Sequence, residues 1–500
     1  MKDIIFIHPP PIIDPKDLQK SLMPPYLVGY GLLHIASYLK SQGCDVDVWN
    51  IPMFYFNGFD LEDIKALIKH NNPLLIGVEL NWLQFASGAI ELTKIIKEIN
   101  PNIKVVLGGV HATIFAEPII KKYSEFDAIF LGEAEASFNQ YYQNLENNRS
   151  LENIPGCYIR KNGRIIKNEG RKTLEIDEIP PYSLTLLKPR LKETFNVGSI
   201  NTCRGPCVFE CQYCIGSRKN YPIMLGSRKK LAIHSPKWIL KQIKLLLRDT
   251  RNLAIQDYIY CAPKKRINEI FTLLKKEKLA DNIEYFNIAA KPGSFDKDSL
   301  NLMSDAGIDN IDYGIETGSD SVLSKLRRGY TSQKVLDSID ATVEAGIFPK
   351  TYWMVGLPDE KDLGETKKLI KETIDRFAYP RWITPLIILP NTELFRTPEK
   401  FNIKIRMKTF EEFLSFSTSK INRQRYYPQV ITHTTKDMNV DDILNAANEL
   451  KDYILTFKEK IIENLKTGMK KYFHFHERLK EPLIITRLVH ALDTLKNTLF

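Results

Sequence analysis

Short apolar runs alternate with stretches of helical spacing over the first 150 residues. The stretches Tyr30–Gln42, Leu61–His70 and Phe85–Asn100 repeat apolar residues at intervals of three to four, which predicts helices. Buried strands separated by helices predict a doubly wound, Rossmann-like parallel sheet in residues 1–150, covered on both faces. Ligands of such sheets bind beyond the carboxyl ends of the strands. The expected strands are Ile4–His8, Val46–Trp49, Leu74–Val78, Lys104–Leu107 and Ala128–Leu131.

A second alternating series occupies residues 196–400, after a segment without this rhythm. In that segment, residues 151–195, an alternating stretch around Asn162-Gly163 predicts a hairpin, and Pro180-Pro181 ends regular structure, so we expect a linker. The second series has helical stretches such as Pro236–Arg248 and Ser332–Ala345 between its strands. Six strand–helix units predict a partial (β/α)6 TIM-type barrel with chemistry at the strand ends. The expected strands are Asn196–Asn201, Leu253–Tyr258, Ile283–Ala289, Asn310–Ile315, Lys350–Val355 and Trp382–Leu389.

Residues 401–500 lose the alternation and read as a mostly helical domain. Asn439, with Asp442 three positions later, predicts the capped start of a long helix. Its apolar stripe runs from Ile443 to Leu465. A packing helix is the favoured interpretation, and a substrate lid or partner surface is the alternative.

Composition and charge exclude several classes of protein. The chain has 500 residues, a net charge of +10 and 43% hydrophobic residues, which is typical of a globular protein. Basic residues are spread along the chain, so the charge argues weakly for a nucleic-acid partner. No run of about 18 apolar residues predicts a membrane span, and Met1-Lys2-Asp3 followed by a short apolar run predicts no secretory signal. We therefore expect a cytoplasmic protein.

The cysteines are unevenly distributed. Four of the seven fall within twelve residues, in the sequence TCRGPCVFECQYC that begins at Thr202. Cys207, Cys211 and Cys214 form a Cys-x3-Cys-x2-Cys loop after the first expected barrel strand. Three thiolates suit a [4Fe–4S] cluster with one iron left open for a small chelating ligand. The alternative is a structural zinc site with Cys203 as fourth ligand, but zinc sites more often use two separated ligand pairs.

These residues resemble the radical S-adenosylmethionine (SAM) enzymes, and in particular their cobalamin (B12)-binding subgroup. The three cysteines with Tyr213 before the last one form the radical SAM signature. The resemblance extends from residue 1 to about residue 400, and Arg328 stands where the subgroup usually has lysine. The further matching stretches are Gly314–Ser319, Arg328–Thr331, Gly356–Glu360 and Pro390–Leu394.

The resemblance implies a set of residues around SAM. Glu316 would contact the ribose, Tyr213 the adenine and Lys291 the carboxylate, although an exposed lysine is an equally good interpretation of Lys291. The remaining candidates are Gln256 and Asp257, where relatives have two aspartates, Gly356, which would let backbone approach SAM, and Tyr352, which would line the substrate cavity.

The resemblance also implies cobalamin contacts in the first domain. A loop after the third strand would face the corrin ring, and two glycine-rich stretches would approach the nucleotide tail. The usual Asp-x-His-x-x-Gly motif is missing, so we expect cobalamin without a protein histidine on cobalt; a domain that has lost cobalamin is the alternative. The implied contacts are Glu79, Leu80, Asn81, Trp82, Gly108, Gly109, His111, Ala112, Thr113, Gly132 and Glu133.

The function implied is a cobalamin-dependent radical SAM methyltransferase. A 5′-deoxyadenosyl radical would remove hydrogen from an unactivated carbon, and methylcobalamin would supply the methyl group. The alternatives are a non-methylating cyclisation, rearrangement or oxidation, and a zinc- or cluster-stabilised nucleic-acid-binding protein. A methylthio-transferring tRNA enzyme is rejected because it needs three more cysteines near the N-terminus. The expected partners are a small-molecule or peptide substrate and a one-electron reductant such as flavodoxin or ferredoxin.

Overall fold

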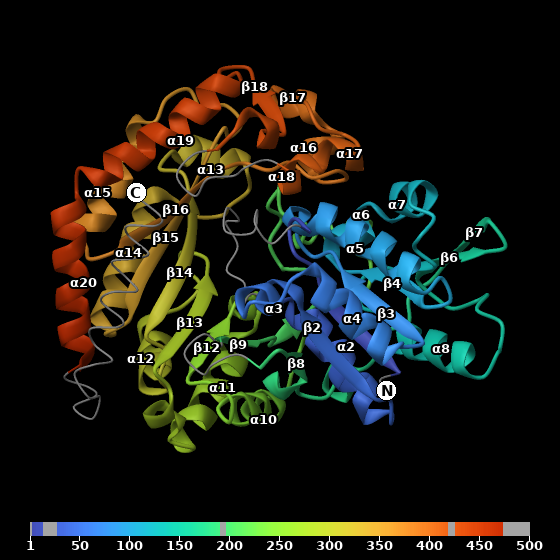
Figure 1. Ribbon diagram of the computed structural model, residues 1–500. Helices are drawn as coiled ribbons and strands as arrows, with labels where there is room; N and C mark the ends of the chain where they lie inside the picture. Colours follow the sequence, from blue (N-terminus) through green and yellow to red (C-terminus); the bar gives the residue numbers. More distant parts are fainter. Residues whose placement is uncertain (1–2, 14–27, 191–196, 419–425, 474–500) are drawn as a thin grey trace.

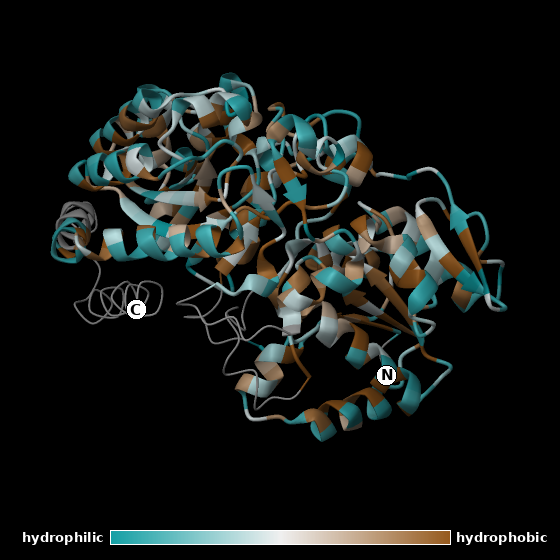
Figure 2. Ribbon diagram, turned by 90° about the horizontal axis from the view of Figure 1, so that it is seen from above, coloured by the Kyte–Doolittle hydropathy of each residue, from teal (hydrophilic) through white to brown (hydrophobic). Residues whose placement is uncertain are grey.

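Two mainly parallel sheets stand side by side in the computed structural model, which describes residues 3–13, 28–190, 197–418 and 426–473 (Figure 1). The first sheet has eight strands in the order β7-β6-β5-β4-β3-β1-β2-β8, and the second has six in the order β16-β15-β14-β13-β12-β9. The α/β architecture expected from the hydrophobic pattern is confirmed. Helices display alternating hydrophobic and hydrophilic faces around the strands (Figure 2).

The first sheet is covered on both faces. Along β1, Ile4 and Phe6 enter one hydrophobic core cluster, whereas Ile5 and Ile7 enter the other. Helices α2 (Tyr30–Ser41) and α8 (Glu135–Glu146) supply the first cluster, and α4 (Leu61–Asn71), α5 (Ala86–Ile99) and α7 (Ala116–Lys122) supply the second. This double burial explains why the strands read as continuous apolar runs. The parallel strands are β1 (Ile4–His8), β2 (Val46–Asn50), β3 (Leu75–Glu79), β4 (Lys104–Gly108) and β5 (Ala128–Phe130).

Three short strands within residues 151–190 belong to the first sheet, in a segment for which the sequence predicted a linker with a hairpin. The predicted hairpin forms as β6 (Cys157–Lys161) and β7 (Arg164–Asn168), and β6 pairs antiparallel with β5. At the opposite edge, β8 (Leu187–Lys188) pairs with β2. The segment therefore extends both edges of the sheet before the chain enters the second one, and residues 191–195 of the expected linker lie outside the described ranges.

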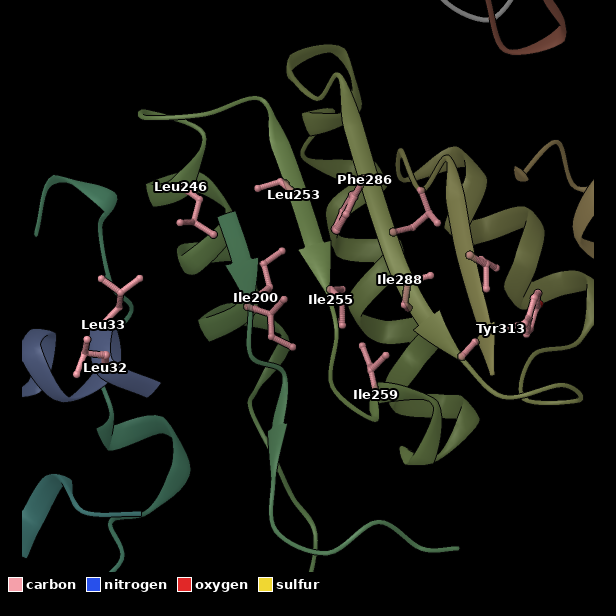
Figure 3. Close-up of a cluster of buried hydrophobic side chains, with 14 of the residues drawn as sticks. Leu32, Leu33, Ile200, Leu246, Leu253, Ile255, Ile259, Phe286, Ile288 and Tyr313 are labelled. Carbon is pink, nitrogen blue, oxygen red and sulfur yellow. The ribbon is translucent and has the colours of Figure 1, made fainter. Parts of the chain in front are cut away.

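The second sheet is an open, six-stranded parallel array with helices on its convex face. A continuous hydrophobic layer fills the space between strands and helices, and Figure 3 shows part of it, from Leu246 to Tyr313. The strands are β9 (Val197–Ile200), β12 (Asn252–Ile255), β13 (Tyr285–Ala290), β14 (Asn310–Glu316), β15 (Phe348–Val355) and β16 (Tyr379–Pro385). The helices are α10 (Pro236–Leu246), α11 (Lys264–Lys276), α12 (Lys297–Asp305), α14 (Ser332–Glu344) and α15 (Gly364–Asp375). The predicted strand start at Asn196 lies outside the described residues.

The last described residues bridge the two sheets. Helix α17 (Phe410–Phe413) packs on the first domain, where Phe410 lies 5.4 Å from Phe115 between ring centroids. A short hairpin of β17 (Ile403–Ile405) and β18 (His433–Thr435) leads to α19 (Val440–Leu455), which packs on β15 and β16. The single helix expected after Asn439 is two helices, because α20 (Lys458–Phe473) starts anew. The packing interpretation is thus supported for α19, and residues 474–500 lie outside the described ranges. Within the described ranges, none of the helices has the length and apolar character that crossing a bilayer requires.

Candidate functional site

The cysteine loop lies directly after β9 and is pinned by hydrogen bonds. The Cys207 amide donates to the Gly216 carbonyl at 2.8 Å, which closes the loop. The buried Asn220 side chain donates to the Gln212 and Cys214 carbonyls at 3.0 Å each. Cys207 and Cys211 are buried and Cys214 is partly exposed. The loop thus presents three thiols that the chain itself holds in place.

The zinc alternative needs a fourth ligand beside the three cysteines of the loop. The proposed fourth ligand, Cys203, is buried in β10 (Cys203–Arg204), where it pairs with Ile233 of β11 (Ala232–Ile233). Cys203 thus lies in the strand that leads into the cysteine loop, four residues before Cys207.

A fourth thiol beside the loop was missed by sequence reasoning. The Cys261 sulfur lies 3.3 Å from that of Cys207, and this hydrogen bond lowers the pKa of Cys207 to about 7. Cys261 follows β12, whose carboxyl end meets the loop at the same edge of the sheet. The shared edge was the one available sequence signal, since 54 residues separate the two cysteines.

An ionic network joins the cysteine loop to the end of β14. The buried Arg328 guanidinium donates to the Cys211 sulfur at 3.3 Å and lies 3.0 Å from the Glu316 carboxylate. Tyr213 donates its hydroxyl to the same carboxylate at 2.9 Å. Glu316 has a φ of 74°, in the left-handed region, at an irregularity between β14 and β15. Two predicted SAM residues are therefore brought together, and Arg328 connects them to a cluster cysteine.

Lys291 is a buried cation near the same network. Its side chain is 5% exposed, and its Nζ lies 3.2 Å from the centroid of the Phe209 ring. Burial lowers the pKa of Lys291 to about 8. Its Nζ has no hydrogen-bond partner within the described ranges. Because an unpaired buried ammonium is costly, this geometry suits an anionic ligand group and argues against the interpretation as an exposed lysine.

Asp257 and Gln256, after β12, have different surroundings. The buried Asp257 carboxylate accepts from the amide and the hydroxyl of Thr202, the latter at 2.7 Å, and from the Cys203 amide at 3.0 Å. Burial raises the pKa of Asp257 to about 6. Gln256 is exposed. Asp257 thus anchors the backbone that leads into the cysteine loop.

Gly356 and Tyr352, on β15 and its end, contact protein groups. Gly356 has a φ of 74°, and a Cβ there would lie 3.1 Å from Ile443, so the close approach that it permits is to α19. The approach of its backbone to SAM stays a prediction. Tyr352 donates its hydroxyl to the Asp312 carboxylate at 3.1 Å, on the concave face of the second sheet.

Loops at the carboxyl end of the first sheet form a second polar cluster. The Glu79 carboxylate is hydrogen-bonded to the His8 ring and accepts a hydrogen bond from the side-chain amide of Asn81 at 2.5 Å. His111 Nδ1 lies 2.5 Å from the backbone carbonyl oxygen of Asn81. Burial lowers the pKa of His111 to about 4 and keeps it neutral. His8, which ends β1, was not among the sequence candidates. Its pairing with Glu79 spans 71 residues.

The remaining first-domain candidates separate into two groups. Leu80 and Ala112 have side chains enclosed in the hydrophobic core, so a contact with cobalamin would come from their backbone and stays a prediction. Trp82 is partly exposed and lies against Phe85. A Cβ on Gly108 would meet nothing within 4 Å, whereas one on Gly109 would lie 2.8 Å from Asn81. The end of β4 therefore keeps open space at Gly108.

The loop after β5 docks onto the second domain. Thr113 accepts a hydrogen bond from the Gly132 amide at 2.9 Å. The Glu133 carboxylate is held by Arg228 at 2.8 Å and Arg204 at 3.4 Å, and all three side chains are nearly buried. Glu133 was expected to contact cobalamin, and in the structure it ties the first domain to the strand before the cysteine loop.

Comparisons with known proteins agree with this two-part architecture. Residues 25–141 match the B12 binding domain and residues 205–371 match the Radical SAM superfamily. The chain is therefore a B12-binding radical SAM enzyme, a family whose typical cofactors are a [4Fe–4S] cluster, SAM and cobalamin.

Particular relatives span most of the chain. It is 25% identical to the uncharacterized methyltransferase PH0819 of Pyrococcus horikoshii, over 79% of this chain and 86% of that protein. It is 24% identical to the anaerobic magnesium-protoporphyrin IX monomethyl ester cyclase of Rubrivivax gelatinosus, over 82% of this chain and 72% of the relative. The structure of the methyltransferase TsrM from Kitasatospora setae superposes with a TM-score of 0.68 at 13% identity, covering 90% of this chain and 89% of TsrM. This last likeness shows a shared fold.

Proposed function

We propose that this enzyme is a methyltransferase that acts on an unactivated carbon, with SAM as methyl source and cobalamin as carrier. The observation that carries the proposal is the match to PH0819, which is named a methyltransferase and aligns across both domains. The cytidylyl-2-hydroxyethylphosphonate methyltransferase of Streptomyces wedmorensis supports it at 22% identity over 71% of this chain. The cyclase match favours a second candidate, a non-methylating cyclisation on the same two cofactors.

The residues of the second domain fit a cluster and SAM. Cys207, Cys211 and Cys214 would ligate three irons, and the unpaired Lys291 ammonium would receive the SAM carboxylate. Tyr213 and Glu316, joined by a 2.9 Å hydrogen bond, would bind the nucleoside part. When bound, these cofactors supply a radical that removes a substrate hydrogen and a methyl group that replaces it.

The first-domain loops would hold cobalamin at the end of β4. A Cβ on Gly108 would meet no atom within 4 Å, and the Glu79, Asn81 and His111 network fixes the neighbouring loops. Thr113 and Gly132 hold the adjacent loop, and Glu133 fixes its position against the cysteine-bearing domain. The chain would thereby keep the cobalamin-binding edge of the first sheet at a fixed distance from the cluster-binding edge of the second sheet. A one-electron reductant such as flavodoxin or ferredoxin would supply the electron.

Transfer of a labelled methyl group tests the proposal. The enzyme, loaded anaerobically with iron, sulfide and hydroxocobalamin, would be reduced and given SAM with a deuterated methyl group. We expect labelled methyl on the cobalamin recovered from the protein, as found by mass spectrometry. Formation of 5′-deoxyadenosine without any label on cobalamin would contradict methyl transfer and favour the cyclase-like candidate.

A further inference from the structure

The two faces of the second sheet differ in exposure. On β14, Ile311, Tyr313 and Ile315 are buried against the helices, whereas the alternating residues Asp312 and Gly314 are partly exposed. The same alternation recurs at Ala289 of β13 and at Tyr352 and Met354 of β15. Because successive side chains of a strand point to opposite faces, the partly exposed set lines the concave face. That face is therefore partly exposed in the middle of β13, β14 and β15.

The concave face is layered from the cofactor end downward. On β14, Gly314 lies between Asp312 and Glu316, and Ala289 of β13 lies between Asn287 and Lys291, which follows the strand. The register places Ala289 beside Asp312, and Gly314 beside Tyr352 of β15. Asp312 lies four residues before Glu316, or roughly 13 Å along the strand at about 3.3 Å per residue. On each of the two strands a small residue therefore separates the cofactor end from a polar residue, and these polar residues form a floor.

Two acceptor atoms of this floor have no partner. One oxygen of Asp312, Oδ2, accepts from Asn287 Nδ2 at 2.8 Å and from the Tyr352 hydroxyl at 3.1 Å. Asp312 Oδ1 and Asn287 Oδ1 are both buried and without a hydrogen-bond partner in the described part of the chain. Asn287 is 2% exposed. Since an unsatisfied buried acceptor costs about 1–3 kcal/mol, these atoms call for N–H donors from a ligand.

The charges of the floor indicate what else the ligand carries. Arg381 lies 3.7 Å from Asp312 Oδ2 with its side chain 29% exposed, and Lys350 donates to the Tyr285 hydroxyl at 3.1 Å. The floor therefore has two cations and one carboxylate. A ligand with an ammonium and a carboxylate would place each of its charges beside an opposite charge of the floor.

We infer that the floor binds the zwitterionic head group of an α-amino acid, which makes the substrate an amino acid; this rests on the proposed function. The ammonium donates to Asp312 Oδ1 and Asn287 Oδ1, and the carboxylate accepts from the Arg381 guanidinium, which suits paired carboxylate contacts. The side chain of the amino acid then extends past Ala289 and Gly314 toward Lys291 and Glu316. The carbon to be methylated is thus on the side chain.

Head-group selectivity tests the inference by ligand-observed NMR on the cofactor-loaded enzyme. Three series of probes share a side chain and differ only in head group: leucine, phenylalanine and lysine, each with its decarboxylated and its deaminated analogue. We expect the amino acid of at least one series to bind about tenfold more tightly than both analogues. Equal binding within every series, or no binding of any amino acid, would overturn the inference.

Variants locate the effect at the floor. Asp312→Asn and Arg381→Gln should each weaken binding of that amino acid about tenfold or more, while Asp305→Asn, an exposed partner of Lys275, should leave it unchanged. Retention of cobalt and an unchanged urea midpoint establish that each variant is folded; if one is not, the other carries the test. Folded variants that bind normally would refute the assignment. Selective binding without methyl transfer would refute only the proposed reaction, and methyl transfer without head-group selectivity would refute only this inference.

Discussion

The two sheets of this enzyme use their surfaces differently. The first is buried on both faces and offers a ligand only its carboxyl edge, where Gly108 and the Glu79 cluster lie. The second is buried against helices on one face and has partly exposed residues on its concave face, with the cysteine loop at its end. The comparison teaches that a sheet closed on both sides can hold a cofactor at its rim, whereas an open sheet can also enclose a substrate.

Loss of a cluster cysteine should separate the two regions most sharply. In Cys211→Ala we expect near-complete loss of bound iron and of 5′-deoxyadenosine formation, because two thiolates do not hold the cluster. Cobalamin retention should stay at the wild-type level, since its proposed contacts lie on the other sheet. Metal analysis and product chromatography give both values. Continued 5′-deoxyadenosine formation would contradict the cluster assignment.

Breaking the tie between the sheets should cost stability. Glu133→Gln leaves Arg228 and Arg204 without part of their nearly buried counter-charge, and we expect a loss of about 3 kcal/mol in the free energy of unfolding. Urea unfolding provides the measurement. The control Glu117→Gln, in an exposed pair with Lys121, should cost less than about 0.5 kcal/mol. Equal effects would mean that Glu133 is not a link between domains.

The two faces of the second sheet should respond unequally to truncation. Ile311→Ala on the convex face removes a fully buried side chain and should destabilise the fold by about 2–5 kcal/mol. Tyr352→Phe on the concave face removes one hydroxyl from a partly exposed position and should cost about 1 kcal/mol or less. The same urea experiment compares them, and a larger cost for Tyr352→Phe would show that the concave face is a structural core.

Arg328 should set how readily the cluster is reduced. Its N–H group donates to the Cys211 sulfur, and a buried positive charge stabilises the extra electron of a reduced cluster. In Arg328→Gln we expect the ratio of reduced to oxidised cluster at a fixed potential to fall about tenfold. Potentiometric titration followed by electron paramagnetic resonance measures that ratio. The exposed neighbour Arg327 is the matched control, and an equal shift in Arg327→Gln would rule out a specific role for the buried arginine.

Glu360 should give the smallest effect, a pH dependence of stability. Burial raises the pKa of Glu360 to about 7 from an ordinary value of 4.5. Between these values the folded state binds the proton that the unfolded state has released, so stability should fall as the pH rises from about 4.5 to 7. Glu360→Gln should flatten this decline. Urea midpoints at several pH values measure it, and an unchanged slope would be the opposing result.

The amino-acid sequence was sufficient to predict those structural features that are periodic or local. The strands of both sheets and the cysteine spacing were recognisable because their signals lie within a few residues of one another. Residues 151–190 were misjudged because an edge pairing such as that of β8 with β2 depends on tertiary contact. The break between α19 and α20 could not be predicted, because no proline or glycine lies at the boundary of the two helices.

The missed site residues share one property. Arg328 lies 117 residues from Cys211, Cys261 lies 54 from Cys207, and His8 lies 71 from Glu79. Each is brought to its partner only when strand ends meet at one edge of a sheet. Residue type and local spacing do not show which strand ends are neighbours. Such residues can therefore be identified only once the fold is known.

The central claim is that this chain holds both cofactors at once. The most direct measurement is the iron and cobalt content, with the absorbance spectrum, of enzyme purified without oxygen, supplied with iron, sulfide and hydroxocobalamin, and desalted. The account predicts about four irons and one cobalt per chain, with cobalamin bands above a broad cluster shoulder. About four irons without retained cobalt would contradict it, because the first domain would then not be a cobalamin site and methyl transfer would have no carrier.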